Sequence, residues 1–292
     1  MCGCPGNMRH LAIIPARNEG RFVGDMLASL LRQTEPPDRI VIVDDESTDD
    51  TGRIVETLAG RHPNVRLLRH AARADDVMGP AVARAFTFAY HQHRLDGYTY
   101  VSKFDADLVF PQHYCATVLR HLDEHPEVGE AGGVLQDAAR GGVPSRVSPN
   151  HVVGALKTFR REALDAIGGL EEVSGWDIVD QVKLRTLGWR ISALARLPVL
   201  HRRPHGGRDG GFRGKVHWGR GAWVIGSHPL FVLARGVYRM LEPPYIIGGL
   251  AFWGGYLLAA LKRVPRLHDP IVVARLRAEQ LHRLLAWNRA SE

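Results

Sequence analysis

Carboxylates directly follow two apolar segments of the sequence. Asp105 and Asp107 follow the run YTYVSKF at 98–104. Asp44 and Asp45 end a second run, RIVIVDD at 39–45. A carboxylate at the end of a buried strand is costly unless another charge compensates it. A hard divalent cation takes oxygen ligands, and if it also touches a diphosphate it neutralises the charge that develops on a phosphate leaving group. The sequence therefore suggests metal-assisted chemistry on a phosphate ester.

The spacing of the first pair admits two interpretations. Alternate side chains of a strand point the same way, so Asp105 and Asp107 would emerge on one side of the sheet as a ligand pair. Alternatively, both are surface residues of a turn, with Asp107 capping the segment before Pro111. Taken alone, the D-x-D pattern does not separate the two.

Short apolar runs alternate with segments of helical periodicity in the first two thirds of the chain. The apolar runs predict strands at 10–16, 39–45, 65–70, 98–107, 129–136 and 190–201. The periodic segments predict helices at 20–33, 47–60, 79–93 and 111–123, the second of them capped by Ser47 or Thr48. Repeated strand–helix units of this kind build an α/β fold with a mostly parallel central sheet and helices on both faces.

Ligands of such sheets bind outside the carboxyl ends of the strands. Three polar segments follow strands here, at 15–19, 44–47 and 105–107, and we expect them to converge on one edge. No G-x-G-x-x-G follows the first strand, which disfavours a dinucleotide oxidoreductase.

Charge is distributed unevenly along the chain. Residues 1–200 carry a net charge of −3 and residues 201–292 a net charge of +10, and a basic segment of this kind suits phosphates or a membrane surface, or is simply a solvated face. Three cysteines do not make a disulfide framework, and the first ten residues lack the apolar core of a signal peptide. We therefore expect a cytoplasmic location.

The segments IIPARNEG, IVIVDDESTDDT and FDAD together resemble the family 2 glycosyltransferases, over roughly residues 10–200. The resemblance implies a GT-A-like three-layer sandwich, a nucleotide-sugar donor, and Mg²⁺ or Mn²⁺ held by Asp105 and Asp107 against the donor diphosphate. It also implies that Asp45 accepts a hydrogen bond from the nucleotide base. The remaining residues assigned to the donor site on this basis are Pro15, Ala16, Arg17, Glu19, Asp44, Lys103, Asp105, Trp176 and Arg202.

A further element of the resemblance is SGWDIVDQVKLRTLGWRI at 174–191. Inverting transfer needs a base that takes the proton from the attacking hydroxyl. By match with the family, Asp177 is that base, and Asp180, one helical turn on, is the competitor. His201 matches a third metal contact of many GT-A enzymes, with His205 as the fallback, while Arg202 and Arg203 could hold the departing diphosphate.

The remaining chain predicts a different kind of region. The glycine-rich stretch 205–221 indicates a mobile loop, either closing over the donor or acting as a linker, with Trp218 and Arg220 as candidate contacts to sugar or phosphate. Residues 243–261 carry no charge and lie near the lower length limit of a bilayer span. The glycines of this stretch and its Pro-Pro start favour a short hairpin or an interfacial helix instead. The basic segment after it and an amphipathic helix at 271–287 fit attachment to an anionic cytoplasmic leaflet, although a buried helix of an ordinary domain is an alternative.

We accordingly predict a catalytic domain at 1–204 and a basic, apolar helical C-terminal region at 205–292, peripheral on the inner face of the cell membrane. The expected activity is metal-dependent, inverting transfer of a hexose from a UDP- or GDP-sugar to a glycan or lipid-linked acceptor in cell-surface polysaccharide or glycolipid synthesis. A nucleotidyltransferase that makes nucleotide-sugars is the alternative enzyme, although the first loop has only one glycine with which to grip a triphosphate. A basic module for RNA is disfavoured because the acidic strand ends would repel nucleic acid.

Overall fold

The computed structural model describes residues 9–71, 78–94, 96–137, 148–203, 210–241 and 243–289. The chain divides into two compact units. The first unit consists of residues 1–76, 81–170 and 187–204, and the second of 77–80, 171–186 and 205–292. The second unit thus takes residues 171–186 from the range that we assigned to the catalytic domain, and the functional division at residue 204 stays a prediction.

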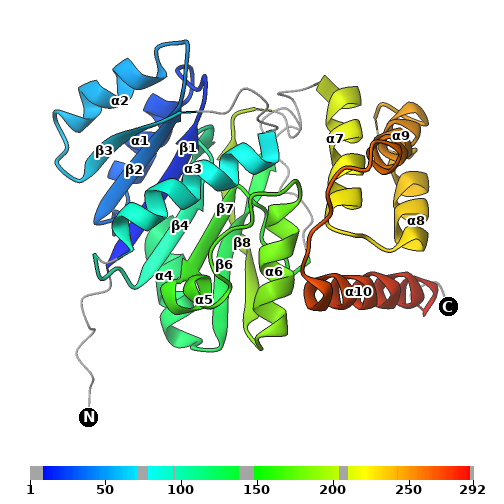
Figure 1. The fold of residues 1–292 in the computed structure, drawn as a ribbon. Coiled ribbons are helices and arrows are strands. Elements are labelled where there is room, and N and C mark those ends of the chain that lie inside the picture. Colours follow the sequence, from blue (N-terminus) through cyan, green and yellow to red (C-terminus); the bar gives the residue numbers. More distant parts are fainter. Residues whose placement is uncertain are drawn as a thin grey trace. The chain divides into compact units, whose positions relative to one another are not determined.

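The first unit is built on an eight-stranded sheet with the order β3-β2-β1-β4-β7-β6-β8-β5 (Figure 1). The strands are β1 (His10–Ala16), β2 (Arg39–Asp45), β3 (Val65–His70), β4 (Tyr100–Phe104), β5 (Leu108–Val109), β6 (Val128–Asp137), β7 (Leu156–Arg160) and β8 (Arg190–His201). Neighbouring strands pair in parallel except where β7 and β5 join their neighbours. The predicted mostly parallel sheet is confirmed.

Both faces of this sheet are covered. On β1 and β2, the alternate residues Ala12, Ile14, Ile40 and Ile42 share a core cluster with helices α1 (Val23–Leu31) and α4 (Tyr114–Glu124). The intervening residues of the same strands, which face the other way, are also fully buried: Leu11, Ile13, Val41 and Val43. Continuous apolar strands with no exposed face are typical of the central layer of a three-layer α/β fold.

The other helices of this part of the chain are α2 (Thr51–Ala59), α3 (Met78–His93) and α5 (Arg161–Ala166), and α3 crosses the near face of the sheet in Figure 1. The predicted helices all exist, with shorter bounds at α1, α2 and α4. The predicted cap of α2 is wrong, because the helix begins after Asp50 rather than at Ser47 or Thr48. The short elements β5, β7 and α5 were not predicted.

The second unit is helical, as predicted for the C-terminal region. It contains α6 (Trp176–Thr186), α7 (Gly210–Val224), α8 (Pro229–Arg239), α9 (Ile247–Leu261) and α10 (Pro270–Arg289). Buried side chains from α6, from α10 and from the residue directly after α7 form a common core: Val179, Val182, Ile225, Val272 and Leu276. The helix expected at 271–287 is confirmed as α10.

The glycine-rich stretch is not a loop over residues 210–221, because these residues belong to α7; residues 205–209, including His205, lie outside the described part of the chain. The glycines serve close packing of α7 on α9. A Cβ on Gly219 would stand 1.9 Å from the carbonyl oxygen of Phe252, and a Cβ on Gly255 would stand 2.1 Å from that of Val216. Only glycine allows backbones to approach this closely.

Among the residues that the structure describes, no helix combines the length and the apolarity that a bilayer crossing requires. Helix α9 covers most of the uncharged stretch 243–261 and is 15 residues long. At about 1.5 Å per residue it extends about 22 Å, short of the roughly 30 Å of hydrocarbon in a bilayer.

Candidate functional site

The carboxyl ends of β1, β2 and β4 lie at one edge of the sheet. These strands are adjacent and parallel, with Ala16 of β1 paired to Asp44 of β2 and Ile13 of β1 paired to Lys103 of β4. The polar segments that follow each strand therefore gather on the first unit, where strand topology predicts ligand binding.

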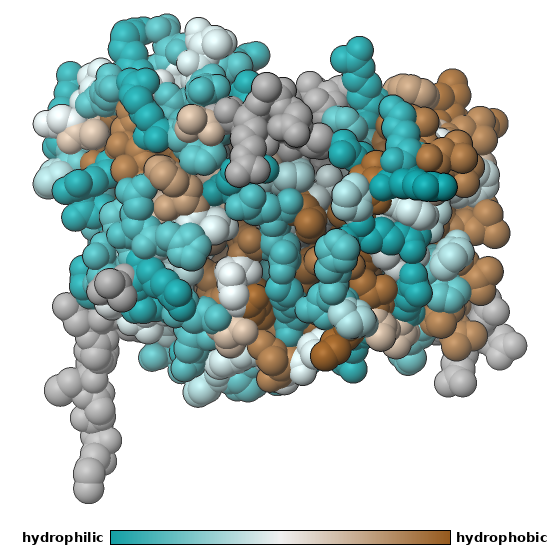
Figure 2. Space-filling view, viewed as in Figure 1, coloured by the Kyte–Doolittle hydropathy of each residue, from teal (hydrophilic) through white to brown (hydrophobic). Residues whose placement is uncertain are grey.

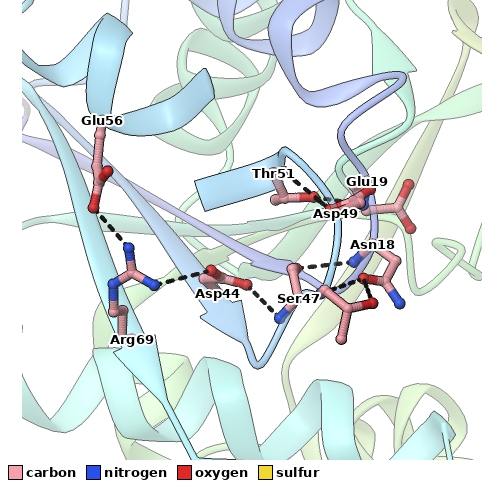
Figure 3. Close-up of polar contacts among 9 residues, drawn as sticks. Asn18, Glu19, Asp44, Ser47, Asp49, Thr51, Glu56 and Arg69 are labelled. Carbon is pink, nitrogen blue, oxygen red and sulfur yellow. Dashed lines mark hydrogen bonds and ion pairs between the residues drawn. The ribbon is translucent and has the colours of Figure 1, made fainter. Parts of the chain in front are cut away.

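The loops after β1 and β2 are interlocked by hydrogen bonds (Figure 3). The backbone amide of Asn18 donates to Ser47 Oγ at 2.9 Å, and the side-chain oxygen Oδ1 of Asn18 accepts from the Thr48 backbone amide at 2.8 Å. The next two backbone amides of the first loop also donate to side chains of the second, from Glu19 to Thr51 Oγ1 at 2.8 Å and from Gly20 to the carboxylate of Asp49 at 2.9 Å. Four successive contacts fix the first loop against the start of α2.

Asp44 is a structural member of this edge. Its side chain is buried, and Oδ1 accepts a hydrogen bond from the Ser47 amide at 3.0 Å. Its other oxygen lies 3.9 Å from the Arg69 guanidinium, which also binds Glu56 at 2.7 Å (Figure 3). These contacts hold Asp44 within the turn that follows β2.

Asp45, the predicted partner of the nucleotide base, lies beside a histidine of the neighbouring strand. Its Oδ1 is 2.9 Å from Nδ1 of His70, the residue paired with it in the register of β2 and β3. The ring of His70 packs on Phe88 at 4.9 Å between centroids. Glu46, which follows, has a φ of 54°, a left-handed conformation that favours glycine.

The D-x-D pair does not lie on a strand. Strand β4 ends at Phe104, and residues 105–107 form a turn that leads into β5, so the alternation argument for the pair is wrong. Asp105 is partly exposed and pairs with Lys103, whose buried ammonium also donates to the Gly154 carbonyl at 3.0 Å. Lys103 therefore orients the first carboxylate of the pair.

Asp107 is buried among cationic partners. Its Oδ2 lies 3.3 Å from Nε2 of His201 and 3.7 Å from Nε of Arg203. Burial would raise the pKa of Asp107, but the hydrogen bond from His201 and the charges of His201 and Arg203 outweigh it and lower the pKa below its ordinary value. Its other oxygen, Oδ1, is buried and has no hydrogen-bond partner among the described residues.

Arg203 connects Asp107 to the first loop. Its guanidinium makes two hydrogen bonds to the buried Glu19 carboxylate, at 3.2 and 2.7 Å, and lies over the Phe22 ring at 5.2 Å. A bidentate pair of this type fixes both position and orientation. Arg202, a predicted donor-site residue, is exposed and pairs with Asp25 at 3.0 Å, and its role at the donor stays a prediction.

The predicted metal ligands are not assembled as a group of three. Within the described residues, no cluster of three or more His, Cys, Asp or Glu side chains is arranged to hold an ion. Asp107 contacts His201, whereas Asp105 is directed to Lys103. Oδ1 of Asp107 nevertheless is a hard donor, and Mg²⁺ sites commonly use one or two carboxylates with substrate phosphates and water completing the shell. These residues fit a cation whose coordination is completed by a diphosphate.

The predicted bases lie in the second unit. Asp177 is in the first turn of α6 and half-buried, following the buried Trp176. Asp180 is 1% exposed, and its Oδ1 accepts a hydrogen bond from the Gln181 amide at 2.6 Å. Greater accessibility favours Asp177 over Asp180 as a group that meets an acceptor.

Of the other predicted donor residues, Pro15 and Ala16 end β1, and the exposed Arg17 begins the interlocked loop. Sequence reasoning missed the roles of Asn18, of His70 and, beyond a general diphosphate contact, of Arg203. His70 was recoverable, since the ends of neighbouring parallel strands share a register. The pairing of Arg203 with Glu19 carried no local signal, because 184 positions separate them.

The chain is similar to known proteins in sequence and in fold. The sequence model described as Glycosyl transferase family 2 matches residues 11–168, more than half of the chain. A curated relative, beta-monoglucosyldiacylglycerol synthase of Synechocystis sp., is 27% identical over 210 residues, which are 64% of this chain and 42% of that protein. The chain therefore spans less than half the length of this relative.

Solved structures share the fold. Mannosyltransferase PcManGT from Pyrobaculum calidifontis, in complex with GDP-Man and Mn²⁺, superposes with a TM-score of 0.59 at 21% identity, over 97% of this chain and 79% of that one. TarS 1-349 of S. aureus in complex with UDP-GlcNAc gives 0.56 at 17% identity, over 86% and 72% of the two chains. At these identities the likeness concerns the fold, and the predicted GT-A-like α/β sandwich is confirmed.

Proposed function

Because the chain belongs to glycosyl transferase family 2, we propose that it transfers a sugar from a nucleoside diphosphate sugar to an acceptor hydroxyl, with inversion at the anomeric carbon. The observation that carries the proposal is the buried Asp107 at the carboxyl edge of the sheet. His201 and Arg203 lie on one of its oxygens, and the other has no hydrogen-bond partner within the described part of the chain. An anionic group with a spare hard donor at this edge suits a metal–diphosphate ligand.

In this proposal the first unit binds the donor. Asp45 accepts a hydrogen bond from the base, the loop at 15–19 lines the nucleotide pocket, and Lys103 keeps Asp105 oriented. Asp107 would hold Mg²⁺ or Mn²⁺ through Oδ1, and Asp105 and His201 would join it only by leaving their present contacts with Lys103 and Asp107. The ion, when bound, supplies positive charge to the departing diphosphate. Arg203 positions Asp107 and the first loop relative to each other through its two carboxylate partners.

The acceptor hydroxyl needs a base on the side opposite to the leaving diphosphate. We assign this role to Asp177, which takes the proton as the oxygen attacks the anomeric carbon, and Asp180 is the competitor. The accessible place of Asp177 at the start of α6 supports this choice.

Two observations support a proposal for the acceptor class, the name of one relative and the charge of the C-terminal region. The name of the Synechocystis relative refers to a glucosylated diacylglycerol, and the basic 201–292 region suits work beside an anionic surface. The proposed acceptor is therefore a glycan or a lipid-linked acceptor at the inner face of the cell membrane, in cell-surface polysaccharide or glycolipid synthesis.

A donor screen tests the chemistry without knowledge of the acceptor. Purified protein is incubated with a panel of UDP- and GDP-sugars and Mn²⁺, and the release of nucleoside diphosphate is measured together with the anomer of the freed sugar by proton NMR. We expect slow hydrolysis of one donor with inverted configuration. Retained configuration would refute the inverting mechanism, and pyrophosphate release from a nucleoside triphosphate and a sugar phosphate would indicate a nucleotidyltransferase.

A further inference from the structure

Large apolar side chains are concentrated on the exposed surface of α8, α9 and their connection. Of 16 exposed large hydrophobic residues in the described chain, 12 lie between residues 230 and 261. They are Leu230, Leu233, Val237, Tyr238, Leu241, Tyr245, Ile246, Ile247, Leu250, Leu257, Leu258 and Leu261. We call this set the α8–α9 surface, and Figure 2 shows brown atoms gathered over these two helices. Contiguous apolar patches of this kind mark interaction sites.

Helix α9 buries its small residues and exposes its large apolar side chains, the reverse of a helix that faces water. Its buried positions are mostly small, with Gly248, Gly249, Ala251, Gly255 and Ala259 accompanied by Phe252. Its outward positions carry the large aliphatic side chains, which recur at 247, 250, 257, 258 and 261. A helix that is apolar all round is buried in a protein or in lipid. The small residues allow α7 and α8 to pack closely on α9. The bulky residues of α9 remain exposed and available for contact with another apolar environment.

Helix α8 contributes to the same surface. The Trp253 indole of α9 donates to the Val232 carbonyl of α8 at 3.1 Å, and a Cβ on Gly249 would stand 2.4 Å from the Gly236 carbonyl oxygen. The two helices are thus tightly joined, and Leu230, Leu233 and Val237 lie at helical spacing on the exposed side of α8.

The segment that contains this surface is rich in positive charge. Between Asp209 and Asp269 the sequence holds eight Lys and Arg residues and one acidic residue, Glu242. Arg235 on α8 is exposed, and Lys262 and Arg263 are exposed directly after α9. Basic side chains that border an apolar surface favour contact with anionic lipid headgroups.

We propose that the α8–α9 surface docks the protein onto an anionic bilayer, with α9 lying along the membrane plane and its outward aliphatic side chains entering the boundary between headgroups and acyl chains. The length of α9 and the absence of a crossing helix among the described residues agree with an in-plane arrangement. This inference does not depend on the proposed sugar transfer, since it concerns only the second unit.

Vesicle flotation tests the proposal with the full chain. Wild-type protein is mixed with vesicles of phosphatidylglycerol and phosphatidylcholine, or of phosphatidylcholine alone, and the fraction that floats in a density gradient is measured. We expect flotation with the anionic vesicles and a decrease at high salt. Protein that stays at the bottom with both kinds of vesicle would overturn the proposal.

Variants assign the binding to this surface. Leu250→Glu and Leu257→Glu should each lower the vesicle affinity about tenfold or more, because each replaces an inserted leucine by a charge. Leu187→Glu is the matched control, as Leu187 is 54% exposed in the first unit, against 53% for Leu250, and should leave binding unchanged. Equal loss in all three variants, or in none, would contradict the assignment.

The electrostatic contribution has its own pair of variants. Lys262→Gln with Arg263→Gln should reduce binding to anionic vesicles several-fold, while Arg61→Gln with Arg66→Gln, two exposed charges of the first unit, should not. Light scattering tests the alternative that this surface joins two copies of the chain. A wild-type dimer that Leu257→Glu converts to a monomer, without any vesicle binding, would make this surface a contact between copies of the chain and overturn the lipid assignment.

Discussion

Arg203, two residues beyond the end of β8, holds Glu19 in the first loop through two hydrogen bonds of 3.2 and 2.7 Å. The same guanidinium lies 3.7 Å from Asp107. One side chain thereby connects the loop expected to line the nucleotide pocket with the carboxylate expected to face the metal. The shape of the proposed donor site depends on this connection.

Replacing Arg203 should destabilise the protein. Arg203→Gln leaves the buried Glu19 carboxylate without its bidentate partner, and we expect a loss of about 3 kcal/mol in the free energy of unfolding. Arg202→Gln is the control, since its ion pair with Asp25 is exposed and should contribute less than about 1 kcal/mol. Urea denaturation measures both, and equal losses would show that the Glu19 contact is unimportant.

Glu46 provides a backbone test of the turn after β2. Its φ of 54° is a conformation that costs a residue with a Cβ about 1 kcal/mol and costs glycine little. Glu46→Gly should therefore be more stable than Glu46→Ala by about that amount. The stabilities of the two variants are compared by thermal unfolding. A more stable alanine variant would argue against the left-handed conformation at this turn.

The buried His10 predicts a pH dependence of stability. Burial lowers its pKa from 6.5 to about 4, against the opposing effect of Asp38, and its Nε2 lies 2.7 Å from the hydroxyl of Ser102. Between about pH 6.5 and 4 the unfolded chain binds a proton that the native protein does not, so stability falls as the pH is lowered through this range, by up to about 3 kcal/mol.

The measurement is the free energy of unfolding at pH 7 and pH 5 for wild type and His10→Gln. The variant should show a smaller difference between the two pH values. An unchanged difference would mean that other groups cause the acid destabilisation.

Substitution of Asp177 and substitution of Asp180 should have different effects. Asp177→Asn should lower transfer by about 10²- to 10⁴-fold because the base is lost, while binding of the nucleotide diphosphate is kept. Asp180→Asn should act mainly on stability, because Asp180 is buried and bonded to a backbone amide. Assays of transfer and of nucleotide binding on both variants test this. Full turnover in Asp177→Asn would move the base to another residue.

The sequence predicted the sheet well where apolar runs were long and cleanly bounded. β1, β2 and β3 have the expected limits, because each is an apolar run closed by polar residues. β7 was missed because its five residues include Lys157, which reads as a surface residue. In the structure this side chain is fully buried and paired with Glu130 of β6 at 3.0 Å, a long-range contact that no local pattern reveals.

The errors have identifiable causes. The D-x-D pair was placed on a strand because apolar content continues to Phe104, but the register of β4 with β7 ends there. The glycines of α7 indicated a loop, since glycine disfavours helices, whereas here they allow contact with α9. The edge of the sheet was predictable from topology, but the division of Asp105 and Asp107 between Lys103 and His201 required the coordinates.

Binding of UDP and GDP by calorimetry, with and without Mn²⁺, is the most direct test of the proposed donor site. Wild-type protein should bind at least one of them at least about tenfold more tightly with the ion present, and Asp107→Asn should lose this gain. Asp25→Asn, an exposed carboxylate on α1, should keep it. Binding that is independent of Mn²⁺, or that is unchanged in Asp107→Asn, would contradict the assignment of Asp107 to a metal–diphosphate site.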